Sequence, residues 1–111
     1  MLMRVFKTKR FAKWAKKEKL SDGVLCQAIY EMEKGLIDAH LGEYVYKKRI
    51  ASNDQGKRKS YRAILAFKIR DKAFLIFGFS KNKLANVNKE QLKQLKILAR
   101  QFFHYNDFEL Q

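Results

Sequence analysis

Three apolar runs follow one another in the second half of the chain, and they restrict the fold more than any other feature. Residues 44–51, 61–69 and 73–80 are rich in Tyr, Val, Ile, Phe and Leu, which is typical of strands. The link 69-IRDKA-73 predicts a tight hairpin, and the polar link 52-SNDQGKRKS-60 predicts a longer loop. We therefore expect the three runs to form an antiparallel meander.

Helical periodicity dominates the first third of the chain, after a short strand at residues 2–6. Residues 8–19 carry an apolar stripe with lysines around the rest, which indicates an amphipathic helix. A second helix begins at Ser21 or Asp22, which can cap it, and Gly35 ends it at a natural C-cap position.

A third helix is predicted near the C-terminus. Asn88 and Gln91 have the spacing of a capping box. The apolar positions that follow have helical spacing: Leu92, Leu95, Leu98, Ala99, Phe102 and Phe103. The order of elements predicts one α+β domain over residues 1–111, a small antiparallel sheet with the two N-terminal helices on one face and a C-terminal helix.

The chain is strongly basic. It has 25 Lys and Arg against 11 Asp and Glu, a formal net charge of +14 and a pI of about 10.0. Such a charge destabilises a compact chain by self-repulsion, so we expect a polyanionic partner. Nucleic acid is the first candidate, an acidic protein the second and an anionic membrane surface the third.

Metal and cofactor chemistry has little support in the sequence. Cys26 is the only cysteine, and its place beside Leu25 and Ile29 predicts an inert thiol in or near the core. His40 and His104 have no metal-ligand spacing. We expect neither a metal nor a cofactor.

No segment has the pattern of a signal peptide or a membrane span. The N-terminus meets a charge before an apolar stretch can form. The longest apolar run, 73-AFLIFGF-79, is too short to span a bilayer as a helix. We expect a soluble, cytoplasmic protein.

Seven Lys or Arg and a single acid lie within residues 44–67. Because side chains alternate along a strand, Lys47 and Arg49 share one face of their strand. If the next strand pairs with it, Arg62 joins them on that face. Arg58 from the loop and Lys81 from the end of the last strand would then lie near the same group. The prediction is a basic depression on an open sheet face, with the N-terminal helices on the opposite face.

A simpler interpretation of these charges is a solvated edge. Lys and Arg are common on exposed strands, where they hinder edge-to-edge pairing. The basic first helix, with Lys9, Arg10 and Lys13, also has two interpretations. These residues either form a solvated helix face or bind nucleic-acid phosphates without base preference.

Several segments in order resemble the RelE/HigB-type toxins of bacterial type II toxin–antitoxin systems, in the RelE/ParE superfamily. They are 2-LMRVFKTKRFAKWAKKEKLSD-22, then GLID, YKKRIA, the YRAILAF strand and the FGFSKN ending, and the resemblance covers about residues 3–103. The resemblance implies a microbial-ribonuclease-like fold and a ribosome-dependent endoribonuclease, an mRNA interferase that cuts in the decoding site. It also implies a cognate antitoxin as partner, and operator DNA only as the toxin–antitoxin complex.

The resemblance places basic side chains around the scissile phosphate. Carried over residue by residue, this role falls on Lys47, Arg49 and Arg62, and less directly on Arg58 and Lys81. The basic residues expected to bind other RNA phosphates are Lys9, Arg10, Lys13, Lys57 and Lys59.

These side chains permit a metal-independent attack of the RNA 2′-hydroxyl on the adjacent phosphate. Arg49 and Arg62 would stabilise the charge on phosphorus, and Lys47 is the candidate general base because neighbouring cations favour its neutral form. Lys81 is the first choice for the leaving-group acid, and the alternatives are Arg58, Tyr61 and Tyr105. Two other functions remain open: a non-enzymatic toxin that inhibits DNA gyrase, in the manner of ParE, and a plain nucleic-acid-binding module.

Overall fold

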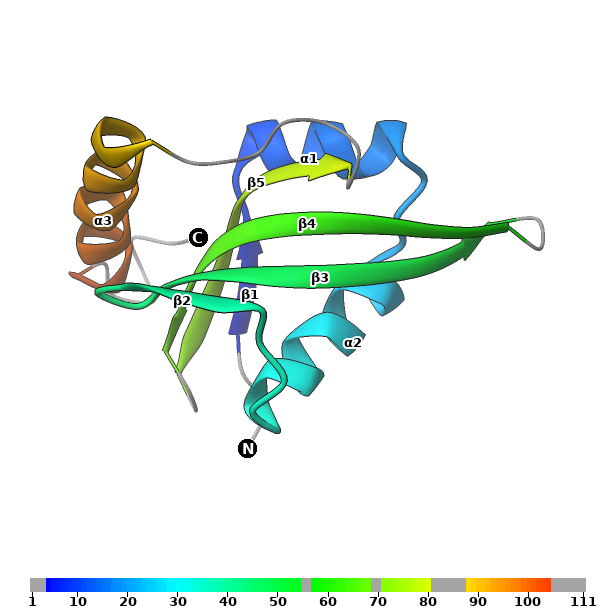
Figure 1. The fold of residues 1–111 in the computed structure, drawn as a ribbon, viewed down its shortest axis with the longest axis horizontal. Coiled ribbons are helices and arrows are strands. Elements are labelled where there is room, and N and C mark those ends of the chain that lie inside the picture. The colour runs from blue at the N-terminus through cyan, green and yellow to red at the C-terminus, as the bar shows by residue number, and fades with distance from the viewer. Residues whose placement is uncertain (1–3, 55–56, 69–70, 81–87, 105–111) are drawn as a thin grey trace.

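A computed structural model describes residues 4–54, 57–68, 71–80 and 88–104, with the backbone alone at 52–54 and 57–59. In chain order the elements are β1 (Arg4–Lys7), α1 (Lys9–Lys17), α2 (Asp22–Glu33), β2 (Ala39–Gly42), β3 (Val45–Asp54), β4 (Lys57–Lys68), β5 (Lys72–Ser80) and α3 (Lys89–His104) (Figure 1). This is the α+β architecture that the sequence predicts.

The strands form one five-stranded sheet in the order β1-β5-β4-β3-β2. The predicted meander is present, because β3, β4 and β5 pair in sequence and antiparallel. β1 pairs with β5 in parallel, with Phe6 opposite Phe74, so the sheet is mixed. A parallel neighbour needs a long crossover, and here most of the chain lies between the two strands.

The β3–β4 hairpin is longer than the sequence predicts. Pairing continues to Asp54 opposite Lys57, so the expected loop at 52–60 is wrong. Lys57, Arg58 and Lys59 therefore lie on β4 and not in a loop. Local polarity predicts a loop here, but pairing between two long strands extends the ladder past it.

The short strand β2 is absent from the sequence prediction. It pairs with β3 through a turn in which Gly42, Glu43 and Tyr44 have φ of 99°, 49° and 67°. Turns of this kind usually carry Asn-Gly or Asp-Gly, because positive φ is unfavourable for other residues. Glu43-Tyr44 is not a typical turn pair, so the sequence does not predict the strand before it.

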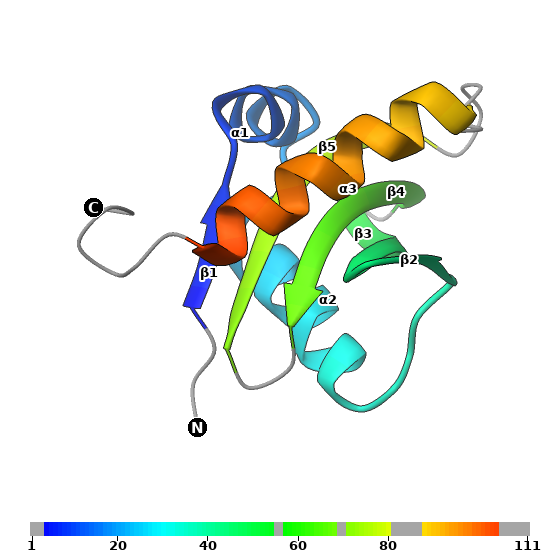
Figure 2. The same cartoon turned by 90° about the vertical axis from the view of Figure 1, so that its left-hand side faces the viewer.

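Helices cover the two faces of the sheet unequally (Figure 2). Phe11 of α1 and Leu25 and Ile29 of α2 pack on one face with Ile50 and Leu65, as predicted. On the opposite face, α3 packs over one end of the strands, and a second cluster of buried residues is formed by Val45, Ile64, Ala66, Phe74, Ile76, Phe79 and Ala99. The remainder of β3 and β4 extends beyond α3 (Figure 1).

Most predicted helix ends are confirmed. The Ser21 hydroxyl accepts from the Val24 backbone N–H at 3.2 Å, and Gly35, with φ of 90°, follows the end of α2. The capping box of α3 is present in both directions, at 2.7 and 3.1 Å between Asn88 and Gln91. Helix α1 stops before residue 19, because Lys19 takes a left-handed conformation with φ of 58°.

Cys26 lies on the solvent-facing side of α2. It is exposed, so the prediction of a thiol in or near the core is wrong. It lies one position away from the buried stripe of Leu25, Ala28, Ile29 and Met32. Within the described residues, no helix is both long and apolar enough to cross a bilayer.

Candidate functional site

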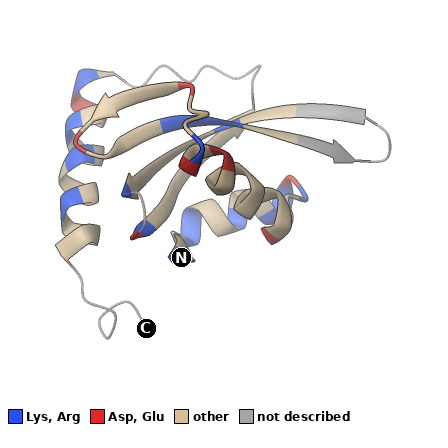
Figure 3. Ribbon diagram, turned by 90° about the horizontal axis from the view of Figure 1, so that it is seen from below, with Lys and Arg blue, Asp and Glu red and all other residues tan. Residues whose placement is uncertain are grey.

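The structure brings Lys47, Arg49 and Arg62 together on the face of the sheet that α3 leaves open. Arg49 lies directly opposite Arg62, and Lys47 lies opposite Ile64, whose neighbour on the same face is Arg62. Figure 3 shows the consecutive basic residues as one blue band on β3. Strand alternation alone places the three side chains on this surface, which we call the cationic face.

The two arginines are linked through one hydroxyl group. Arg49 donates from Nε to Ser60 Oγ at 3.2 Å, and Arg62 donates from Nη1 to the same oxygen at 3.1 Å. Arg62 Nη1 also lies 3.3 Å from the carbonyl oxygen of Tyr61. Two like charges directly opposite each other repel, so these contacts hold the guanidinium groups in an arrangement that is costly by itself.

One carboxylate enters the cationic face. Asp38 Oδ2 lies 3.0 Å from Arg62 Nε, and the Asp38 backbone N–H donates to the Lys47 carbonyl oxygen at 3.1 Å. Asp38 immediately precedes β2, and because no sequence pattern predicts β2, none predicts Asp38 beside the basic residues. A predicted strand at 39–42, paired with β3, would have placed Asp38 beside β3.

The cationic face is open to solvent and to ligands. Arg49 is exposed and Lys47 is half-buried. The side chains of Arg62 and Asp38 are 23% and 28% exposed. Both guanidinium groups are therefore at least partly accessible to solvent.

Lys48 points to the opposite face and has a structural role. It is buried, and its Nζ lies 2.7 Å from Glu31 Oε1 on α2. The hydrogen bond from Lys48 is the main cause of a lowered pKa at Glu31, and burial partly opposes it. Thus one of the seven basic residues at 44–67 stabilises the contact between α2 and β3.

Tyr61 is also on the helix-covered face, and this removes it from the candidates for the leaving-group acid. It is buried, and its ring lies edge-on to Trp14 with centroids 5.6 Å apart. Trp14 also contacts Phe11, with centroids 5.4 Å apart. The cluster belongs to the core, in agreement with the predicted apolar stripe of the first helix.

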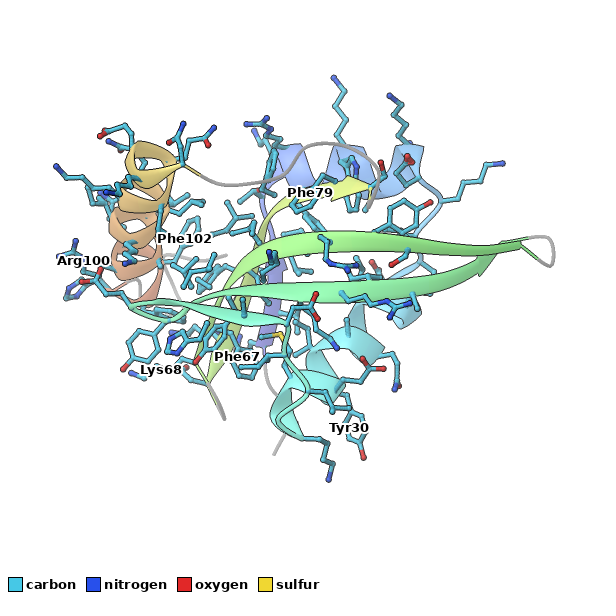
Figure 4. All side chains as sticks on the ribbon, viewed as in Figure 1. Tyr30, Phe67, Lys68, Phe79, Arg100 and Phe102 are labelled. Carbon is cyan, nitrogen blue, oxygen red and sulfur yellow. The ribbon has the colours of Figure 1, made fainter. Side chains whose placement is uncertain are left out.

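The basic residues predicted on the first helix are separate from this site. Lys9, Arg10 and Lys13 are exposed on α1, and several long side chains of this helix extend away from the sheet (Figure 4). Arg10 contacts the sheet, with its guanidinium carbon 4.8 Å from the centre of the Phe77 ring on β5. Phe77 lies opposite Ile64 on β5, two strands away from Arg49 on β3.

Several predicted residues cannot be placed at the level of side chains. Arg58 lies on β4 opposite Asn53, with Lys57 and Lys59 on either side, and their backbone alone is described. Lys81 and Tyr105 lie outside the described residues.

A second basic surface, which was not predicted from the sequence, lies on α3. Lys89, Lys93, Lys96 and Arg100 line an open hollow with Glu43 of the β2–β3 turn. Arg100 Nε lies 3.6 Å from Glu43 Oε2, and both side chains are exposed. No group of three His, Cys, Asp or Glu that could hold a metal ion occurs among the residues with a described position.

A comparison with family models decides the relationship of this chain to known proteins. The model for the RelE toxin of the RelE/RelB toxin–antitoxin system matches residues 3–111. The chain belongs to the RelE toxin family. No curated protein matches it significantly in sequence. The resemblance to RelE toxins is thereby confirmed, and the mixed sheet with its three helices is consistent with RelE-like toxins.

Membership of the RelE family identifies the chain as a toxin of the toxin–antitoxin type, and such toxins pair with antitoxins. In this RelE-family toxin the cationic face combines three basic side chains, one hydroxyl and one carboxylate. Guanidinium groups bind phosphate with paired hydrogen bonds, so the chemistry of this face suits a phosphodiester.

Proposed function

We propose that this toxin is a ribosome-dependent endoribonuclease that cleaves mRNA and so inhibits translation. The observation that carries the proposal is the juxtaposition of Arg49 and Arg62 on an open sheet face, joined through Ser60. Membership of the RelE family supports the same activity.

The proposed reaction uses the nucleophile that RNA itself provides. The 2′-oxygen attacks the adjacent phosphorus, the bond from phosphorus to the 5′-oxygen breaks, and the products carry a 2′,3′-cyclic phosphate and a 5′-hydroxyl. One proton leaves the 2′-hydroxyl and one is delivered to the departing 5′-oxygen. The protein must assist both transfers and stabilise the additional negative charge on the phosphate.

Arg49 and Arg62 are proposed to stabilise that charge. Arg49 can donate two parallel hydrogen bonds to phosphate oxygens from Nη1 and Nη2, and Arg62 can donate from Nη2. Because the groups are held in place before the reaction, little reorganisation is needed when charge develops. The electrostatic repulsion between the two guanidinium groups decreases when an anion binds between them, and this favours binding of a phosphodiester.

The proton transfers are assigned by position. Lys47 is the proposed general base, on the same strand face as Arg49 and two residues away. Lys81 remains the proposed acid, with Arg58 and Tyr105 as alternatives. Tyr61 is excluded from this role, because it is buried on the opposite face.

The ribosome is the proposed site of action, and mRNA the substrate. A net charge of +14 favours association with ribosomal RNA through phosphate contacts. Lys9, Arg10 and Lys13 on α1 are proposed to contribute such contacts, as are Lys57 and Lys59 on β4. The toxin would then act in the cytoplasm and be neutralised by a cognate antitoxin.

The proposal is tested by primer extension on a reporter mRNA in a purified translation system, with and without ribosomes. Wild type is compared with Lys47→Ala and Arg62→Ala, and with Lys34→Ala as a control that removes an exposed lysine outside the cationic face. We expect cuts on translated mRNA alone, lost in the two site variants and retained in the control. Intact mRNA together with growth arrest by wild type would contradict the nuclease and favour gyrase inhibition or simple binding.

A further inference from the structure

Asp38 is unexpected at a site that is proposed to bind an anion. The chain has only 11 acidic residues against 25 basic ones, yet one acid lies beside the two arginines. A carboxylate there reduces the positive potential that a phosphate would experience. Its presence therefore calls for a role other than attraction of the ligand.

The contacts of Arg62 indicate that role. Asp38 Oδ2 lies 3.0 Å from Nε, and Nη1 donates to Ser60 at 3.1 Å and to the Tyr61 carbonyl oxygen at 3.3 Å. Two of the three guanidinium nitrogens are thus engaged by the protein. Among the residues that the structure describes, none hydrogen-bonds to Nη2.

We propose that Asp38 and Ser60 are positioning residues that hold the Arg62 guanidinium so that its Nη2 edge faces a bound phosphodiester. This rests on the proposed nuclease function and extends it to two residues outside the basic cluster. Ser60 also holds Arg49 through Nε at 3.2 Å, so one hydroxyl aligns both guanidinium groups.

Stabilisation of the fold does not account for this arrangement. The Arg62 and Asp38 side chains are 23% and 28% exposed, and ion pairs with access to solvent contribute little to stability. The Asp38 backbone is anchored separately, because its N–H donates to the Lys47 carbonyl oxygen at 3.1 Å. A change of the carboxyl group should therefore leave the backbone of this segment in place.

The first experiment observes Arg62 without RNA. The Arg62 Nε–H is followed by ¹⁵N NMR in wild type, Asp38→Asn and Ser60→Ala, with thermal unfolding as a check on the fold. Asp22→Asn is the matched control, because Asp22 is an exposed acid at the start of α2 that pairs at 2.9 Å with Lys7 on β1, the opposite edge strand from β2. We expect a shifted resonance and faster hydrogen exchange in the two site variants alone. An unchanged resonance in folded Asp38→Asn would overturn the proposal.

The second experiment measures single-turnover cleavage of mRNA on ribosomes as a function of toxin concentration and pH. We expect the maximal rate of Asp38→Asn to fall on the order of 10²-fold, as is typical for a misplaced catalytic group. The toxin concentration for half-maximal rate should stay the same or decrease, since a negative charge has been removed. Asp22→Asn should cleave as wild type does.

The pH profile separates positioning from proton transfer. If Asp38 acts through Arg62, the profile of Asp38→Asn has the shape of the wild-type profile at a lower rate. If the variant loses the acidic limb of the profile, Asp38 is itself the proton acceptor and the positioning role is wrong. Failure of wild type to cleave would contradict the nuclease proposal alone, because the NMR experiment still reports on Arg62.

Discussion

Arg49 on β3 lies directly opposite Arg62 on β4, and both donate hydrogen bonds to Ser60 Oγ, at 3.2 and 3.1 Å. Like charges in opposite positions of two antiparallel strands destabilise the pair. The fold tolerates this arrangement on a sheet face that α3 does not cover. Such a conflict between stability and local charge is a common property of functional sites.

Replacement of Arg49 by Gln should separate stability from activity. We expect the free energy of unfolding to rise by about 0.5 kcal/mol, because the repulsion with Arg62 is removed. Cleavage should fall by about 10²–10³-fold, the usual effect of losing one donor to a developing anion. Urea unfolding and the primer-extension assay measure the two quantities, and Lys34→Gln is the control for charge removal alone. A loss of stability in Arg49→Gln would show that its contact with Ser60 outweighs the repulsion.

Gly78→Ala should destabilise the protein, because Gly78 lies beneath the indole of Trp14. A Cβ at Gly78 would come within 2.3 Å of the Trp14 ring carbons Cε3 and Cζ3. We expect a loss of about 1–3 kcal/mol in the free energy of unfolding, as is usual for overpacking in a core.

Gly23→Ala is the control for this prediction. The nearest heavy atom to its Cβ would be Ser21 Oγ at 3.7 Å, an ordinary contact, and alanine favours the helix. This variant should be as stable as wild type or more so in chemical denaturation. Equal stability of Gly78→Ala and Gly23→Ala would mean that Trp14 can move aside without cost.

Glu31 should titrate below its ordinary pKa of 4.5, chiefly because Lys48 donates a hydrogen bond to it at 2.7 Å. A lowered pKa in the folded state means that the ionised carboxylate stabilises the fold. This contribution is complete above pH 4.5 and is lost as the pH falls through the folded-state value. Carboxyl ¹³C NMR measures the titration directly, and Lys48→Met should return the pKa of Glu31 toward its ordinary value. A titration unaffected by Lys48→Met would exclude Lys48 as the cause.

The β2–β3 turn offers a site for stabilisation. Glu43 has φ of 49°, a conformation that costs an ordinary residue about 1 kcal/mol and that asparagine tolerates better. Glu43→Asn should therefore raise the free energy of unfolding by about 0.5–1 kcal/mol. The variant also removes the ion pair between Glu43 and Arg100, but that pair is exposed, with its atoms 3.6 Å apart, and contributes little to stability.

Glu43→Gln is the matched variant for the turn. It removes the charge but keeps the unfavourable backbone conformation, so its stability should equal or fall slightly below that of wild type. Thermal unfolding of the two variants distinguishes backbone strain from charge. A gain in Glu43→Gln as large as that in Glu43→Asn would attribute the effect to charge.

The sequence by itself determined the α+β class, every helix and strand except β2, and the grouping of Lys47, Arg49 and Arg62. Alternation along a strand is a local property, and it puts every second side chain on one face whatever the rest of the chain does. The capping box at Asn88 and Gln91 is local in the same way, and the structure contains it at 2.7 and 3.1 Å.

Only the tertiary structure decided what surrounds the basic cluster. Lys48 is as basic as its neighbours, and it is buried against Glu31 because α2 packs on that face. Asp38 reaches Arg62 because β2 pairs with β3 through a turn at Glu43 and Tyr44. These two residue types are not typical of such a turn, so the sequence does not predict it. Both pairs join segments that are far apart in the chain. The unfavourable backbone conformation of the β2–β3 turn is offset by tertiary packing, which no local sequence pattern predicts.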